Sequence, residues 1–308
     1  MSDLLDAGLS SRLDAAWGDP DTWVTNGQHW THLDDIHRLI NRRVSGDPAV
    51  RPLAWFGQHL ADAGCLPLRR VLVLGCGAGL LERELHGLGW AREIVAFDLS
   101  ARVLDVARQN SAGLQGITHV QASMDELPVG QAPFIPGSFD AVLGVSSVHH
   151  CSQLRHLYAA VAQLLAPDGW FYLDEYVGPD RFQYSQRHLN QVRALADLLP
   201  DRLLANAGGV IKKGFRAPTV AEVIEVDPSE AVCSSHILPL LPEHFRVIAE
   251  RPYGGSLLHV LLADIAQNFH APEAKPWLQA LMDAEDDLDR LGQLEHHFSC
   301  VIARQRGV

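Results

Sequence analysis

The hydrophobic positions from residue 70 onward form short apolar runs that alternate with amphipathic segments. A short apolar run that ends in glycine or a polar residue is typical of a buried parallel strand, and apolar positions three and four apart are typical of a helix. The pattern predicts strands at 71–74, 94–97, 118–121, 139–145, 170–176, 245–250 and 297–304. It predicts helices at 80–87, 100–110, 154–165, 185–199, 257–269 and 277–291. This alternation indicates an α/β fold with a doubly wound, mostly parallel sheet of seven strands.

Two stretches do not follow this rhythm. Before residue 65 the chain predicts helices, one with Leu33, Ile36, Leu39 and Ile40 on a single stripe and another at 52–64. After the fifth strand, a long segment rich in glycine and proline interrupts the alternation. We expect four parts, of which the first and third form a lid: an N-terminal helical cap at 1–65, a core at 66–177, an insertion at 178–243 and the end of the core domain at 244–308.

Composition narrows the class of ligand. The 308 residues carry a formal net charge of −12, and the basic doublets are scattered, which argues against nucleic acid and for a small-molecule substrate. The five cysteines form no Cys-x-x-Cys motif, as expected for reduced thiols in the cytosol. The N-terminus lacks the pattern of a signal peptide, and no apolar stretch reaches the length of a membrane span. We therefore expect a cytoplasmic protein without a membrane partner.

The segment VLVLGCGAG at 71–79 joins a predicted strand to a predicted helix. Gly75, Gly77 and Gly79 permit a tight turn and let the backbone approach a ligand with no Cβ in the way. A dinucleotide fingerprint would place its third glycine where Leu80 stands, and the Gly-Lys-Ser/Thr of a P-loop is absent. The turn therefore predicts a site for a ligand without phosphate, the alternative being a plain strand-to-helix turn.

Asp98 stands at the end of the second predicted strand. It follows the glycines at about the separation of an acid that accepts both hydroxyls of a ribose. No lysine or arginine follows directly to favour a 2′-phosphate. The alternative is an acid at the start of the next helix, beside the predicted cap Ser100.

These motifs resemble, in order, those of the class I methyltransferases that use S-adenosylmethionine (SAM). Residues 71–79 are similar to the family's glycine motif and Asp98 to its ribose acid. The segment QASMDELP at 121–128 is similar to the part that grips the adenine, FDAVLGVSSVHH at 139–150 to the fourth strand, and LLAPDG at 164–169 to the turn before the fifth strand.

The resemblance implies a Rossmann-like domain with an antiparallel last strand and SAM as cosubstrate. It implies cofactor contacts from the glycine turn, from the ends of the second and third strands and from the loop after the fourth: Gly75, Cys76, Gly77, Gly79, Asp98, Leu99, Ser123, Met124, Asp125, Ser146 and Ser147. The family often has an acid for the adenine amine where this chain has Ser123, and Asp125 lies two residues further on.

Polar side chains follow the fourth and fifth strands, whose carboxyl ends meet at the ligand edge of such a sheet. His149, His150 and Glu175 are candidate bases, and Tyr176, beside Asp174, could donate to a substrate or place its ring against a cation. The alternatives are a helix-entry loop for the histidines and a core position for Tyr176. Adjacent histidines in a strand face opposite sides, so neither this pair nor the pair at 296–297 predicts a metal site.

Three functions fit these residues. The first is methyl transfer from SAM to a small molecule, which needs positioning, exclusion of water and one base. The second is attack of the amine of SAM on its own Cγ, giving azetidine-2-carboxylate and methylthioadenosine; the chain also resembles, without a distinguishing motif, the bacterial azetidine synthases that cyclise SAM. The third is a SAM-binding regulatory protein without catalysis. The sequence leaves the acceptor and the oligomeric state open.

Overall fold

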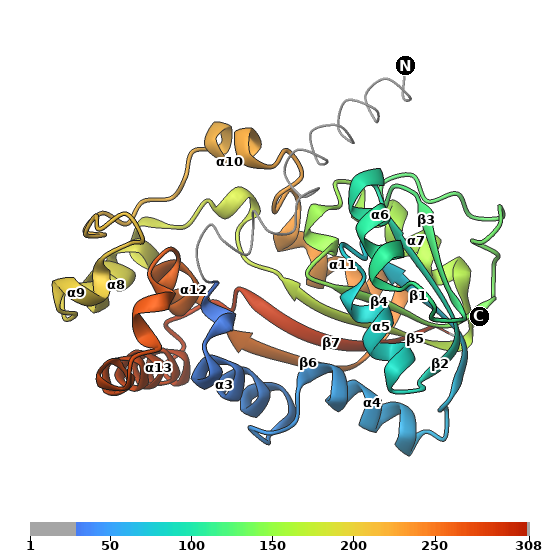
Figure 1. The fold of residues 1–308 in the computed structure, drawn as a ribbon, viewed down its shortest axis with the longest axis horizontal. Helices are drawn as coiled ribbons and strands as arrows, with labels where there is room; N and C mark the ends of the chain where they lie inside the picture. The colour runs from blue at the N-terminus through green and yellow to red at the C-terminus, as the bar shows by residue number, and fades with distance from the viewer. Residues whose placement is uncertain (1–28, 307–308) are drawn as a thin grey trace.

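The computed structural model describes residues 29–306 and places a single seven-stranded sheet at their centre (Figure 1). The strand order is β3-β2-β1-β4-β5-β7-β6. Strands β1 to β5 pair in parallel, and β7 lies antiparallel between β5 and β6. The strands are β1 Leu68–Leu74, β2 Ala91–Asp98, β3 Ile117–Gln121, β4 Phe139–Val145, β5 Leu165–Tyr176, β6 Phe245–Gly254 and β7 Phe298–Gln305. The predicted fold class, Rossmann-like with an antiparallel last strand, is confirmed.

Helices cover both faces of this sheet. One face packs against α3, α4, α5 and α6 and, toward the β6 edge, against α8, α12 and α13, while α7 and α11 cover the other face. The α-helices are α3 Asp34–Ser45, α4 Pro52–Asp62, α5 Leu80–Gly87, α6 Ala101–Asn110, α7 Leu154–Leu164, α8 Gln186–Ala196, α9 Asp201–Leu204, α10 Val220–Val226, α11 Ile237–His244, α12 Ser256–Leu262 and α13 Lys275–Arg290. Short 3-10 turns are η1 Trp30–His32, η2 Val148–His150, η3 Asp180–Phe182, η4 Ser234–His236, η5 Ala266–Phe269 and η6 Pro272–Ala274. Within residues 29–306, no helix is both long and apolar enough to cross a bilayer.

Local signals set several boundaries. The Ser100 side chain accepts from the N–H of Val103, which caps α6, and α5 covers the predicted residues. The single helix predicted at 257–269 is wrong in its second half, because α12 ends at Leu262 and Asp264 adopts a φ of +64°. A residue with positive φ cannot continue a right-handed helix, so the chain turns there before η5.

The described N-terminal helices are fastened to the sheet. The Phe56 ring of α4 is fully buried and stacks on Tyr172 of β5, with ring centroids 4.8 Å apart. A Cβ at Gly57 would lie 2.1 Å from the Trp90 ring, so α4 contacts this ring more closely than any side chain would allow. Arg43 of α3 pairs with the buried Glu285 of α13 at 2.7 Å. The predicted cap at 1–65 reaches into residues outside the described part, and its lid role stays a prediction.

The predicted insertion at 178–243 contains two kinds of structure. Its first part, η3 to α10, lies beyond the sheet on the α12 side (Figure 1). Its last helix, α11, packs on α7 and β6 through Ile237, Leu240 and Leu241 and is part of the core. The lid role of the remainder also stays a prediction.

Candidate active site at the carboxyl edge of the sheet

The turn between β1 and α5 has the shape that its glycines predict. Gly75, Gly77 and Gly79 all adopt positive φ, at +60°, +52° and +82°. A Cβ at Gly75 would lie 2.7 Å from Cβ of Ser147, whereas a Cβ at Gly77 would meet nothing within 4 Å. Gly75 is therefore required by its neighbour, and Gly77 faces open space at the edge where ligands of such sheets bind.

Asp98 closes the end of β2 beside this turn. Its carboxylate accepts from the N–H of Gly77 at 3.0 Å and from the N–H of Ser100 at 3.0 Å. Burial raises the pKa of Asp98, and these N–H groups oppose the rise. The residue thus orients the glycine turn and the start of α6, and Leu99 beside it accepts from the Gln121 amide at 2.9 Å. The bond to Ser100 fits the alternative of an acid at the helix start, and the contact of Asp98 with a ribose stays a prediction.

The segment after β3 divides between two tasks. Met124 reaches toward the glycine turn, with its methyl group 3.6 Å from the position that a Cβ of Gly75 would take. Asp125 instead accepts from Ser152 and Gln153 N–H at 2.8 and 3.0 Å, just ahead of α7, and its own N–H donates to Ser123. Both oxygens of the Asp125 carboxylate therefore already accept hydrogen bonds ahead of α7. The predicted contact of Asp125 with the adenine would have to use one of these occupied oxygens.

Glu175 of β5 is a fully buried anchor for the loop after β4. One carboxylate oxygen accepts from the N–H groups of Ser147 and Val148, both at 2.8 Å. The other lies 2.8 Å from Nδ1 of His149. Ser147 also donates its hydroxyl to the carbonyl of Leu74, and Ser146 adopts a φ of +49° in this loop. These contacts hold the loop and His149 in place, and the role of Glu175 as a base stays a prediction.

The two adjacent histidines lie side by side. Their rings have centroids 4.3 Å apart because residues 148–150 form the 3-10 turn η2. The expectation that this pair faces opposite sides is wrong, since it assumed strand geometry. Nε2 of His149 lies 3.6 Å from Glu230, and Nδ1 of His150 lies 3.0 Å from the Ser229 hydroxyl.

The same surroundings move the pKa values of the two rings in opposite directions. Burial alone would lower the pKa of His149, but the hydrogen bond and charge of Glu175, with the charge of Glu230, outweigh it and raise the pKa. Burial and the neighbouring His149 lower the pKa of His150. The pair thus offers one ring that favours the imidazolium and one that favours the neutral base, a division typical of acid–base sites.

Asp174 and Tyr176 bracket Glu175 on β5. Asp174 accepts from the Tyr253 hydroxyl at 2.7 Å, and burial raises the pKa of this carboxyl to about 6. The Tyr176 hydroxyl donates to the carbonyl of Pro179 at 3.1 Å, and its ring centroid lies 6.3 Å from that of His149. Tyr176 therefore borders the histidine pair, while Asp174 is committed to Tyr253.

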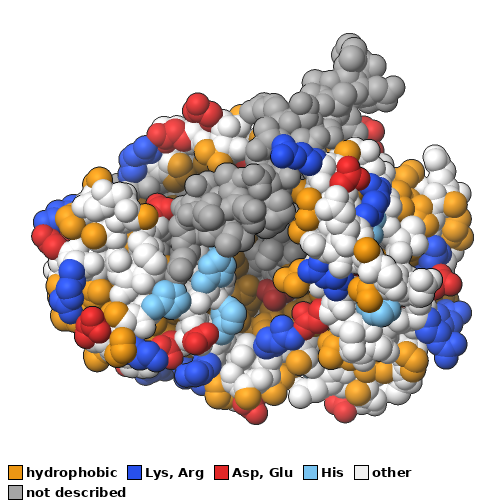
Figure 2. Space-filling model, viewed as in Figure 1, with side chains coloured by type: hydrophobic (Ala, Val, Ile, Leu, Met, Phe, Trp, Pro, Cys, Tyr) orange, Lys and Arg blue, Asp and Glu red, His pale blue; other side chains and the backbone are white. Residues whose placement is uncertain are grey.

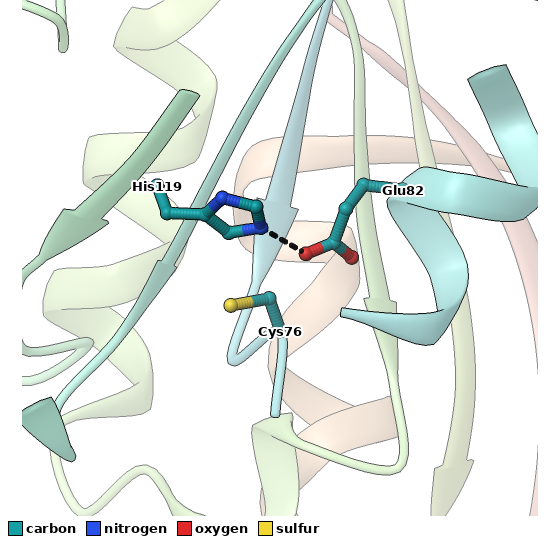
Figure 3. A group of neighbouring side chains, drawn as sticks. All are labelled: Cys76, Glu82 and His119. Atoms are coloured by element: carbon teal, nitrogen blue, oxygen red, sulfur yellow. Dashed lines mark hydrogen bonds and ion pairs between the residues drawn. The ribbon is translucent and has the colours of Figure 1, made fainter. Parts of the chain in front are cut away.

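A second group of possible ligand atoms lies under the glycine turn. Cys76 of the turn, Glu82 of α5 and His119 of β3 converge there (Figure 3). Nε2 of His119 lies 2.9 Å from Glu82, whose side chain is fully buried. Burial raises the pKa of the Cys76 thiol, and the charges of Glu82 and Asp98 raise it further. This cluster and the group His149, His150 and Glu230 have residue types that metals use, and the absence of a metal stays a prediction for both.

The residues that contact the histidine pair were not predicted from the sequence. Asp227, Ser229 and Glu230 come from the turn after α10, far along the chain, and Asp227 lies 3.5 Å from His150. The DPSE sequence at 227–230 reads as an ordinary turn. Only the fold reveals that it faces η2.

The comparisons with known proteins agree with this geometry. Residues 72–173 match the model of a methyltransferase domain. The chain is 34% identical over 151 residues to a ubiquinone biosynthesis O-methyltransferase of Xanthomonas campestris, covering 47% of this chain and 60% of that protein. It is 29% identical over 161 residues to a demethylmenaquinone methyltransferase of Tropheryma whipplei, covering 50% of this chain and 64% of that protein. The chain thus spans about three-fifths of the length of these curated relatives.

The fold also matches solved structures. A phosphoethanolamine N-methyltransferase 2 of Haemonchus contortus, solved with S-adenosylhomocysteine, superposes with a TM-score of 0.52 at 15% identity. The match covers 97% of this chain and 60% of that protein. At this identity the likeness concerns the fold alone. Together, the domain match and this likeness show that residues 72–173 are similar in sequence to a methyltransferase domain and that the chain has a Rossmann-like methyltransferase fold.

Proposed function

We propose that the protein is a SAM-dependent methyltransferase that acts on a small molecule. The observation that carries the proposal is the glycine turn, where Gly77 faces open space beside Asp98 inside a matched methyltransferase domain. A side chain at Gly77 would fill that space, so the turn fits a ligand that lies against its backbone. SAM, when bound, supplies a methyl group on a positively charged sulfur.

The residues of the edge then have distinct tasks. Gly75, Gly77 and Gly79 shape the turn, and Asp98 stands where an acid would accept ribose hydroxyls. Glu175 fixes η2 and holds His149. The similarity to ubiquinone biosynthesis O-methyltransferases supports a hydroxyl acceptor here. His150, whose lowered pKa favours the neutral imidazole, would take the hydroxyl proton.

The test is to separate the products that the purified protein forms from SAM. With an extract of small metabolites as acceptor source, a methyltransferase should form S-adenosylhomocysteine in an amount equal to the methylated product. With SAM alone it should form almost none. Many turnovers to methylthioadenosine and azetidine-2-carboxylate from SAM alone would establish cyclisation instead. Tight binding of SAM with no product under either condition would indicate a regulatory protein.

The proposed setting is a cytoplasmic enzyme with a small-molecule substrate. All five cysteines lie in the described part of the chain and are free, which supports a reducing compartment. The net charge of −12 argues against nucleic acid as a partner, because both would be negatively charged. Fractionation of the cells that make the protein would test the location directly.

A further inference from the structure

A continuous group of rings extends from Tyr176 toward α8 and α12. We call it the ring patch; it consists of Tyr176, Phe182, Tyr184, His188, His259, His297 and Phe298. The centroid of Tyr176 lies 5.1 Å from that of Phe182, 6.0 Å from that of His297 and 5.4 Å from that of Phe298. Figure 2 shows exposed histidine side chains on the face over α12 and α3, beside a hollow in the surface; His297 of the ring patch is buried and is not among them.

Part of the ring patch is a parallel stack. The rings of Tyr184, His188 and His297 lie nearly parallel, with each centroid 4.9 to 5.4 Å from the other two and interplanar angles of 14° to 18°. Such parallel faces are the arrangement that a further flat ring extends with favourable stacking. All seven residues of the ring patch lie outside 72–173, so they belong to the parts of the chain that the domain match does not explain.

The ring patch also holds polar atoms that lack partners among the described residues. They are Nε2 of His188, Nδ1 of His259, Nδ1 of His297 and, at the start of α12, the hydroxyl of Ser256. Ser256 is fully buried and His297 is 1% exposed. Buried polar atoms are paired in the great majority of cases, so four such atoms in one group call for a ligand that pairs with them.

The charge state of the patch restricts that ligand. Burial, together with the neighbouring histidines, lowers the pKa of His297 to about 3 and that of His259 well below its usual value. Burial also lowers the pKa of His188. Near neutral pH these rings are uncharged, each with one donor and one acceptor nitrogen. A formally charged ligand group would find no opposite charge on these three rings, whereas hydroxyl groups can both donate and accept.

We propose that the ring patch is the acceptor site and that it takes an uncharged, hydroxylated aromatic ring, a phenol or catechol. This inference rests on the proposed methyl transfer. A flat ring would extend the stack, and its hydroxyls would pair with the imidazole nitrogens and with Ser256. In the transfer, the phenol oxygen forms a bond to the methyl carbon as the S–CH3 bond breaks. The sulfonium becomes a thioether, and the hydroxyl proton passes to the His150 imidazole.

The experiment uses the full chain saturated with S-adenosylhomocysteine, so that no turnover occurs. Catechol and trans-cyclohexane-1,2-diol, which has two hydroxyls but no aromatic face, are compared by saturation-transfer NMR and calorimetry. Catechol should bind and the diol should not. With SAM in place of the product, catechol should yield its monomethyl ether.

Two variants test the polar atoms separately from the stack. His297→Phe keeps a ring in the stack but removes the nitrogens, and Ser256→Ala removes the orphan hydroxyl. Each should weaken catechol binding about 3- to 10-fold, the loss of one neutral hydrogen bond. The matched control is Ser111→Ala, because Ser111 is equally a buried serine but its hydroxyl already donates to Ala107 at 2.7 Å. This control should bind catechol like the parent.

The outcomes separate the two proposals. Binding of S-adenosylhomocysteine without any binding of catechol would overturn the acceptor inference and leave the methyltransferase proposal standing. Equal binding of catechol and the diol would rule out recognition by stacking and overturn the inference too. Failure to bind S-adenosylhomocysteine would instead count against the proposed function. A Ser256→Ala protein that is less stable than the parent in the absence of ligand would show that its hydroxyl has a structural partner, which also contradicts the inference.

Discussion

The anchor around Glu175 and the ring patch lie next to each other, and their polar groups are in opposite states. Both Glu175 oxygens are occupied, by two backbone N–H groups and by His149. In the ring patch, which begins at Tyr176, the last residue of β5, three histidines and the nearby Ser256 have polar atoms without a partner in the described part of the chain. Both regions are largely buried, so exposure to solvent does not explain the difference.

The contrast separates what the protein completes by folding from what it leaves for a ligand. A saturated anchor fixes the loop after β4 before any substrate arrives, which is the preorganisation that positions reacting groups. Unpaired polar atoms in the ring patch lower the free energy of unfolding of the free protein. A ligand that pairs with them would restore that stability. Four changes, from the largest expected effect to the smallest, would break or sharpen this comparison.

The largest effect is expected for Glu175→Ala. The change leaves two buried N–H groups and the His149 ring without their acceptor, so the free energy of unfolding should fall by about 3–5 kcal/mol. Urea denaturation measures it. The exposed Glu250→Ala should stay within about 0.5 kcal/mol of the parent. A small loss for Glu175→Ala would show that the loop after β4 is held by other contacts.

Asp98→Ala should act chiefly on SAM binding. Each lost hydrogen bond to a charged group costs about 1.5–3 kcal/mol, so the dissociation constant should rise by one to two orders of magnitude. Calorimetry measures it, with circular dichroism to verify the fold. The exposed Asp105→Ala is the matched control at the next acid along the chain. An unchanged affinity would place the ribose contact elsewhere.

The ring patch should make the protein sensitive to acid. The pKa of His297 is about 3 in the folded state, below the ordinary 6.5, so the unfolded chain takes up this proton first. The contribution to stability is therefore complete above about pH 7 and is lost as the pH falls through 6.5 toward 3. Between pH 7 and pH 5, His297 should account for about 2 kcal/mol of the loss.

His297→Phe should reduce this acid loss, because the phenyl ring does not titrate. Urea unfolding of the parent and of the variant at both pH values gives the comparison. If the free energy of unfolding fell equally with pH in the two proteins, protonation of the His297 ring in the folded state would cost little free energy, and the prediction would be wrong.

The smallest effect is expected from removal of metals. His119 already pairs with Glu82, and burial raises the pKa of the Cys76 thiol, so we expect this cluster to be stable without an ion. Dialysis against a chelator should leave the melting temperature and the turnover unchanged. A drop in either that zinc restores would identify a metal at Cys76 or at the histidine pair.

The parts of the structure that depend on neighbouring residues could be predicted from the sequence. The glycine turn, the Ser100 cap and α5 follow from local chemistry, and the position of Asp98 at the turn follows from the topology of parallel strands. The order of strands and helices was sufficient for the fold class.

The contacts between distant segments could not be predicted. Glu230 meets His149, and His188 meets His297, across separations at which a sequence carries no periodic signal. The geometry of η2 also depends on Glu175, which lies on another strand. The positions of the candidate residues along the chain were thus predictable, but their pairing and the resulting shifts in pKa required the fold.

The close fit between α4 and the sheet bears on how the molecule can be divided. Phe56 of α4 covers the Tyr172 ring. At Gly57 the backbone of α4 lies so close to the Trp90 ring that no side chain would fit between them. The domain match begins only at residue 72, yet the surface that α4 covers belongs to β5, a strand within that match. A shortened chain that begins at residue 66 would expose an aromatic face to water and associate with itself. We therefore expect the smallest independently folding unit to be longer than the matched domain, with its N-terminal border before α4.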